Sequence, residues 1–101
     1  MTAVVEIATI EIESGEQDQF EQAIARAYTY LRSSPGYLSH QLQQCLERPE
    51  RYVLTVRWET LEAHTVTFRE SEHFVQWRAL IGSYFAQPPE VLHYRPIELN
   101  A

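Results

Sequence analysis

The 101-residue sequence contains no lysine, because all eight of its basic residues are arginine. Schiff-base chemistry at a lysine side chain is therefore excluded, as is any phosphate-binding loop that requires a lysine. Cys45 is the only cysteine, so the chain cannot form an intrachain disulfide and offers no set of thiolates to a metal. No apolar run approaches the roughly 20 residues that a membrane-spanning helix needs.

Basic residues are outnumbered by 14 acidic ones, which gives a net charge of −6. An acidic surface repels phosphate backbones and anionic lipid headgroups, so we expect neither nucleic acid nor a membrane as a partner. The first thirteen residues contain three glutamates and no basic residue, unlike a signal peptide. We therefore expect a cytoplasmic protein in which residues 1–101 form a single domain, since a chain of this length has room for little else.

Hydrophobic patterning predicts four strands and helical segments between them. Beta-branched and alternating apolar residues predict strands at residues 4–13, 37–46, 52–59 and 91–97. Apolar residues at helical spacing predict a helix over residues 16–32.

Capping residues predict where the helices begin. Ser14 and Gln17 form a capping-box pattern before the first helix. Thr60 and Ser71 are expected to cap two further helical segments between the third and fourth strands. The inward stripe of the segment after Thr60 is predicted to be Leu61, His64, Thr65 and Phe68.

This order of elements, strand-helix-strand-strand-helix-strand, is the ferredoxin-like arrangement. It predicts an α+β fold with a four-stranded antiparallel sheet and helices on one face. The first and third strands carry apolar residues at both parities, for example Val53 beside Leu54. We expect the uncovered face of the sheet to meet a second copy of the chain.

RNA-recognition domains share this order of elements. They stack bases on aromatic residues of a third strand that is basic and contains glycine. Here residues 51–58 contain no glycine and belong to an acidic protein, which disfavours RNA binding.

A series of short motifs runs along nearly the whole chain. They are Pro35-Gly36-Tyr37, a third strand ending in Trp58, Glu62-Ala63-His64, Phe68-Arg69-Glu70-Ser71, Trp77-Arg78, and a Pro-Pro followed by His93-Tyr94. In this order and spacing they resemble the antibiotic biosynthesis monooxygenase (ABM) family.

The resemblance implies a homodimer whose two sheets pack into a dimeric α+β barrel, with a pocket in each subunit between sheet and helices. Some family members oxidise aromatic polyketides or quinols with no metal or flavin, because the deprotonated substrate itself reduces O2. Others cleave heme, isomerise small molecules or have no known activity. Family resemblance therefore predicts the fold better than the reaction.

The heme-cleaving branch of the family relies on an Asn in the first strand and on a Trp and a His in the second helical region. The first strand here has no Asn. The position expected for the Trp lies near Thr67, and the position expected for the iron-binding His lies near Arg78. An axial ligand for the iron is missing, which disfavours heme cleavage.

His64 is the candidate catalytic base. It stands at an inward helical position where an apolar residue is the default, and partial burial would keep its imidazole neutral. The alternative is a packed histidine that bonds to a backbone carbonyl or a tyrosine. No His-x-His or His-x-x-x-His spacing occurs, so we predict no metal site.

Arg69 and Arg78 are the candidate catalytic cations, because each follows an inward aromatic residue and could hold an enolate or phenolate oxygen. The alternative is pairing with the abundant glutamates. Candidate substrate-binding residues would line a pocket for a flat apolar molecule, or else simply form the core. These candidates are Trp58, Phe68, Trp77, Tyr84, Phe85 and His93.

Two functions follow from these residues. The first is a cofactor-independent ABM-type monooxygenase acting on a small aromatic or quinol-like substrate. The alternative is a non-catalytic dimeric module of the same fold that binds a small molecule or assists a partner. A cavity that holds His64 and an arginine would favour the first, and an interior filled by side chains would favour the second.

Overall fold

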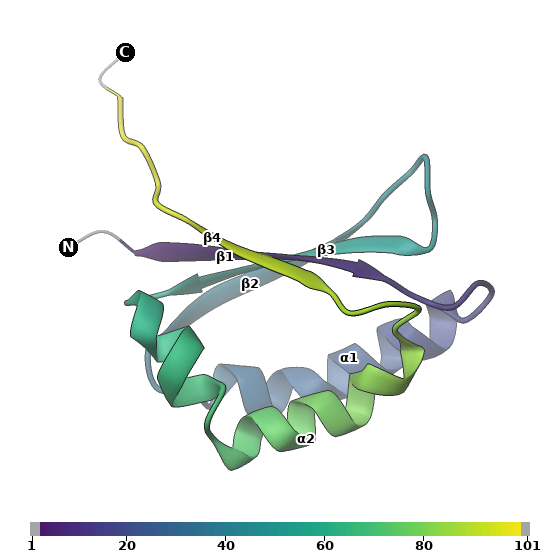
Figure 1. The fold of residues 1–101 in the computed structure, drawn as a ribbon, viewed down its shortest axis with the longest axis horizontal. Helices are drawn as coiled ribbons and strands as arrows, with labels where there is room; N and C mark the ends of the chain where they lie inside the picture. Colours follow the sequence, from purple (N-terminus) through teal and green to yellow (C-terminus); the bar gives the residue numbers. More distant parts are fainter. Residues whose placement is uncertain (1–2, 100–101) are drawn as a thin grey trace.

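The computed structural model describes residues 3–99. Four strands form one antiparallel sheet in the order β2-β3-β1-β4. Both long helices lie on the same face of that sheet, and the other face is bare (Figure 1). This confirms the predicted ferredoxin-like α+β fold. The elements are β1 (Val4–Glu11), α1 (Gln17–Arg32), β2 (Tyr37–Gln44), β3 (Arg51–Trp58), the π-helix η1 (Ala63–Phe68), α2 (Glu72–Ile81), the 3-10 helix η2 (Gly82–Tyr84) and β4 (Glu90–Tyr94).

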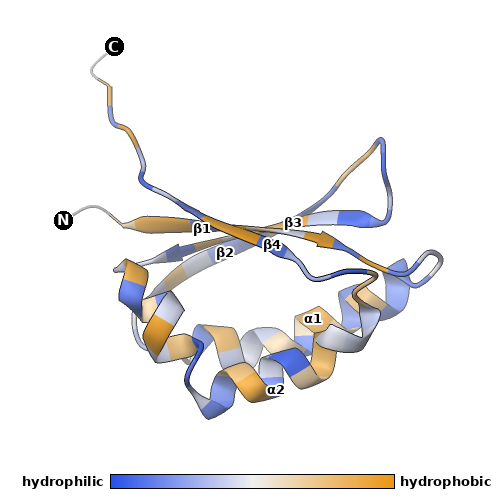
Figure 2. Ribbon diagram, in the orientation of Figure 1, coloured by the Kyte–Doolittle hydropathy of each residue, from blue (hydrophilic) through white to orange (hydrophobic). Residues whose placement is uncertain are grey.

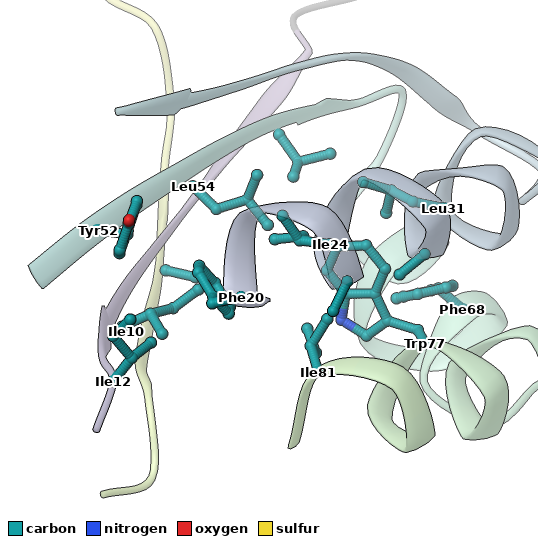
Figure 3. Packing of buried hydrophobic residues seen from close by; sticks show 14 of the residues in the cluster. Ile10, Ile12, Phe20, Ile24, Leu31, Tyr52, Leu54, Phe68, Trp77 and Ile81 are labelled. Carbon is teal, nitrogen blue, oxygen red and sulfur yellow. The ribbon is translucent and has the colours of Figure 1, made fainter. Parts of the chain in front are cut away.

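The core lies between α1, α2 and the inner face of the sheet. The stripe predicted for α1 is buried at Phe20, Ala23, Ile24, Ala27 and Leu31. Figure 3 shows Phe20, Ile24 and Leu31 of α1 packed among core side chains of the sheet and α2. Burial of each large apolar side chain stabilises the fold by about 1.5–3 kcal/mol.

One predicted cap is wrong and two are confirmed. α1 begins at Gln17 with Glu16 as its N-cap and no side-chain cap. Gly15, at φ +83°, turns the chain before the helix starts, which leaves Ser14 outside it. Ser71 and Thr60 behave as predicted, since Ser71 Oγ accepts a hydrogen bond from the Phe74 amide and Thr60 Oγ1 accepts one from the Ala63 amide.

The segment after Thr60 differs from the prediction in its helical period. It is mostly a π-helix, in which the Arg69 amide donates to the carbonyl of His64, five residues earlier. A π-turn is wider than an α-turn, so a different set of side chains faces inward. Ala63, His64 and Phe68 are buried, whereas Leu61 is 42% exposed. The predicted inward position of Leu61 is therefore wrong, and that of His64 is confirmed.

The face of the sheet opposite the helices carries a group of apolar side chains on β1 and β4. β1 alternates strictly, with Glu6, Ala8 and Ile10 buried toward the helices and the residues between them only half-buried. Much of β1 is orange in Figure 2. On the bare face Ile7 pairs with Leu92, and Leu92 is 47% exposed. Within residues 3–99, no helix has the length and apolar character to cross a membrane.

Candidate active site

A cavity of about 410 Å³ lies between the inner face of the sheet and the helices. Its walls come from β1, β3 and β4 on one side and from α1, η1 and α2 on the other. Four aromatic side chains line it, and the volume lies in the range of small-molecule sites. These aromatics are Phe68, Phe74, Trp77 and Phe85.

Glu6 places a carboxyl group in the wall of this cavity. The alternation of β1 directs it to the same side as Ala8 and Ile10, where it is only 6% exposed. Its Oε1 accepts a hydrogen bond from Trp58 Nε1 at 2.9 Å and lies 3.3 Å from His64 Nε2. Burial raises the pKa of Glu6 to about 7, although the Trp58 hydrogen bond and the charge of Arg69 both act to lower it. The carboxyl group can therefore gain or lose a proton near neutral pH.

His64 lies beside Glu6 and is only 3% exposed. Its ring stacks on Trp58, with ring centroids 5.3 Å apart, and its Nδ1 lies 2.8 Å from Nε2 of His93. Burial, followed by the charges of Arg69 and His93, lowers the pKa of His64 to about 3. The imidazole is therefore neutral near pH 7, as the sequence indicated, but a base of such low pKa is a weak proton acceptor.

Arg69 and Arg78 also line the cavity, and both are exposed to solvent. The guanidinium of Arg78 lies 5.3 Å from the centre of the Phe85 ring. Among residues 3–99, neither arginine has a carboxylate within ion-pair distance. The alternative that they pair with glutamates is therefore wrong for this part of the chain. Both cations are available to an anionic group of a ligand.

The cavity brings together most of the predicted site residues. His64, Arg69, Arg78 and three of the predicted aromatics share its wall. These aromatics are Phe68, Trp77 and Phe85. Their contact with a substrate stays a prediction.

Three predicted residues lie elsewhere. Trp58 is fully buried and acts from behind the wall, through its hydrogen bond to Glu6. Tyr84 packs against Phe20, with ring centroids 6.2 Å apart. His93 lies behind His64 and lines a separate, shallow depression. Within residues 3–99, no three His, Cys, Asp or Glu side chains gather as metal ligands do.

Glu6 is the site residue that the sequence reasoning missed. The signal was present, because Glu6 shares the parity of Ile10 and Ile12, whereas Glu11 and Glu13 have the opposite parity. A glutamate on the apolar parity of a strand lies on its buried face. Such a residue is rare unless it is paired, and it is therefore a candidate for function.

The chain was compared with known proteins by sequence and by structure. The sequence model of the antibiotic biosynthesis monooxygenase family matches residues 3–80. The uncharacterized protein YczJ of Bacillus subtilis is 36% identical over 93% of this chain and 99% of its own length. A crystal structure from Bordetella bronchiseptica, assigned to the antibiotic biosynthesis monooxygenases, superposes with a TM-score of 0.94 at 37% identity, covering 97% of this chain and 100% of that one.

A partial match involves a protein of known activity. A mycobilin-producing heme oxygenase of Mycobacterium tuberculosis is 35% identical over 60 residues, which are 59% of this chain and 57% of that protein.

Proposed function

Because this chain belongs to the antibiotic biosynthesis monooxygenase family, we propose that it is a cofactor-independent monooxygenase that acts on a small aromatic or quinol-like molecule. The observation that carries the proposal is the composition of the cavity. It combines aromatic walls, a buried carboxyl-imidazole pair and two arginines that have no carboxylate partner among residues 3–99.

These groups fit the chemistry of an activated phenol or enol. Removal of a proton leaves an electron-rich anion, and Arg69 or Arg78 can stabilise its oxygen by charge-assisted hydrogen bonds. The anion then supplies the electrons that reduce O2. One oxygen atom enters the product, and the other leaves as water with two hydrogens of the substrate. No external reductant is required.

The second candidate is a non-catalytic module that binds an aromatic anion in the same cavity. The same walls and arginines favour it, since binding needs no proton transfer. Heme cleavage is not proposed. Both ring nitrogens of His64 already have partners, Glu6 and His93, so neither is free to bind iron.

We expect the purified protein, without added metal or flavin, to consume O2 in the presence of a reactive member of a panel of hydroquinones, naphthols and anthrones. Arg69→Gln should lower turnover by about 10²-fold, because it removes a charged donor to the oxyanion. Arg48→Gln, at an exposed turn remote from the cavity, is the matched control and should leave turnover unchanged. The measurement is oxygen-electrode rates, with ligand binding followed in parallel. Binding without oxygen uptake across the panel would favour the second candidate.

We also propose that the chain forms a homodimer through the bare face of the sheet. Val5 and Ile7 lie on this face beside Tyr94 and Leu92 of β4, which are nearly half exposed, and Val53 of β3 lies on the same face. An apolar sheet face of this kind is a typical interface between subunits. A cytoplasmic location stays a prediction.

In light scattering at micromolar concentration, wild-type protein should have twice the chain mass of 11.8 kDa. Ile7→Glu should reduce the mass to that of one chain, because it places a charge in the centre of the apolar face. Val75→Glu, on the exposed side of α2, is the control and should remain dimeric. A wild-type monomer would contradict this prediction.

A further inference from the structure

We propose that Glu6, rather than His64, accepts the proton from the bound molecule, and that His64 and His93 are positioning residues that hold its carboxyl group. The inference rests on the proposed function, in that the cavity binds an acidic aromatic molecule.

The two oxygens of Glu6 have different surroundings. Trp58 Nε1 and His64 Nε2 both approach Oε1, at 2.9 and 3.3 Å. Among residues 3–99, no side chain or backbone group forms a hydrogen bond with Oε2. Every fully buried side-chain oxygen of these residues does have a hydrogen-bond partner, so Oε2 is not fully buried. Glu6 itself lines the cavity. Oε2 is therefore the oxygen that a ligand can reach.

His64 lacks such an opening. Its Nε2 faces Glu6 and its Nδ1 faces Nε2 of His93. One ring face stacks on Trp58, and the Phe68 ring lies nearly parallel at 6.2 Å between centroids. A general base needs a lone pair within hydrogen-bond reach of the ligand. Both ring nitrogens of His64, the one with the hydrogen and the one with the lone pair, are directed at other side chains.

His64 and His93 together fix the orientation of Glu6. Glu6 on β1 and His93 on β4 are register partners in the sheet, and His64 bridges them from the π-helix. Carboxylate orientation by a hydrogen-bonded histidine is a common means of supporting a site. His64 is one of the three buried residues of this π-helix.

The charged and titratable groups around Glu6 suit it to exchange protons near neutral pH. They are His64 from η1, Arg69 at the end of η1 and His93 from β4. Burial is the largest influence and raises the pKa of Glu6 to about 7, where a base is most effective at physiological pH. Arg69 acts in the opposite direction and keeps part of the carboxyl population ionised.

The proton transfer is balanced without any other reactant. An O–H or acidic C–H bond of the ligand breaks, its hydrogen binds to Oε2, and its electron pair stays on the ligand. The total charge of Glu6 and ligand remains −1. The negative charge moves from the buried carboxylate to an anion that Arg69 can reach, since Arg69 lines the same cavity.

The first test needs no substrate. Carbon-13 NMR of glutamate carboxyl groups in the ligand-free protein should show one resonance with a midpoint near pH 7, absent in Glu6→Gln and retained in Glu11→Gln. Glu11 lies on the same strand and pairs with Arg51 at 2.6 Å, which makes it a matched control. A Glu6 midpoint near the ordinary value of 4.5 would overturn the proposal.

The second test uses 3-nitrophenol, a weaker acid than Glu6, whose phenolate is yellow and whose phenol is not. The wild type, mixed with this probe in buffer above pH 7, where Glu6 is mostly ionised and the free probe is mostly phenol, should bind it as phenolate. Glu6→Gln should bind it as phenol, whereas His64→Gln should still bind phenolate. Phenolate formation in Glu6→Gln equal to wild type would overturn the proposal.

With a substrate from the oxygen-uptake panel, Glu6→Gln should lower turnover by about 10²–10⁴-fold. His64→Gln should lower it far less, because a glutamine amide can also donate to the carboxylate, and should leave the pH at which activity is half-maximal near 7. A loss in His64→Gln as deep as in Glu6→Gln would overturn the positioning role. If no panel member consumes O2 but Glu6 titrates near pH 7 and ionises the phenol, the monooxygenase proposal fails and Glu6 remains the proton acceptor.

Discussion

In urea unfolding experiments, the unfolding free energy of Glu6→Gln, relative to wild type, should increase by about 1.4 kcal/mol for each unit by which the pH rises between about 4.5 and 6.5. That of His64→Gln should decrease by about as much per unit of rising pH over the same range. Across the two pH units the curves of the variants should thus separate by several kcal/mol. The two slopes have opposite signs because burial shifts the pKa values of an acid and a base in opposite directions.

The sign follows from counting protons on the Glu6-His64 pair. In the unfolded chain between pH 4.5 and 6.5, the glutamate is ionised and the histidine protonated, so the pair holds one proton. In the folded chain burial raises the pKa of Glu6 to about 7 and lowers that of His64 to about 3. The glutamate then holds the proton and the histidine is neutral. The number of bound protons is the same in both states, so the pair gives the wild type no pH dependence in this range.

On folding, Glu6 gains a proton and His64 loses one, and each substitution removes one of these two opposite changes. In Glu6→Gln the folded state binds one proton fewer than the unfolded state, so stability falls as the pH drops below 6.5 toward 3. In His64→Gln the contribution of Glu6 is fully present below pH 4.5 and is lost as the pH rises toward 7.

The double variant Glu6→Gln/His64→Gln is the control, and its unfolding free energy should follow the wild-type pH dependence. Parallel curves for all four proteins between pH 4.5 and 6.5 would show that neither side chain has a shifted pKa in the folded state. That result would also contradict a role for Glu6 as a proton acceptor near neutral pH.

The fold was predictable because its signals are local and repeated. The apolar stripe of α1, from Phe20 to Leu31, and the alternation around Ile10 in β1 each extend over several turns or residue pairs. An error at one position does not erase such a pattern. The Ser14 cap failed because capping depends on a single turn, and Gly15 redirects the chain there.

The site was less predictable because it depends on contacts between distant parts of the chain. The neutral state of His64 could be inferred from its inward position. Its partners, Glu6 and His93, lie on different strands, and only the sheet register brings them together. The π-turn at η1 was also invisible to a search for α-helical spacing, and in it Ala63 faces inward in place of Leu61.

Gly36→Ala should lower the unfolding free energy by about 2–5 kcal/mol, which is a large part of the stability of a small domain. Gly36 has a φ of +86°, which L-residues adopt at a cost of about 1–2 kcal/mol. A Cβ added there would also lie 2.5 Å from the Cβ of Ala63. Overpacking of this kind adds about 1–3 kcal/mol.

Gly15 offers a matched control for the backbone cost. Its φ is +83°, but a Cβ added there meets nothing within 4 Å. Gly15→Ala should therefore lose only the 1–2 kcal/mol of backbone strain. Equal losses in the two variants would show that the contact with Ala63 carries no cost and that the chain relaxes around it.

A third variant separates the contact from the strain at Gly36 itself. In Gly36→Ala/Ala63→Gly the opposing methyl group is absent, so the loss should be smaller than the sum of the two single losses by about 1–3 kcal/mol. The contact also bears on the site, because Ala63 is the first residue of η1 and directly precedes His64. If Gly36→Ala displaces η1 from the sheet, the titration midpoint of the Glu6 carboxyl resonance should move from about pH 7 toward 4.5 in that variant. The midpoint should not move in Gly15→Ala. An unchanged Glu6 midpoint in folded Gly36→Ala protein would show that the position of His64 does not depend on this packing.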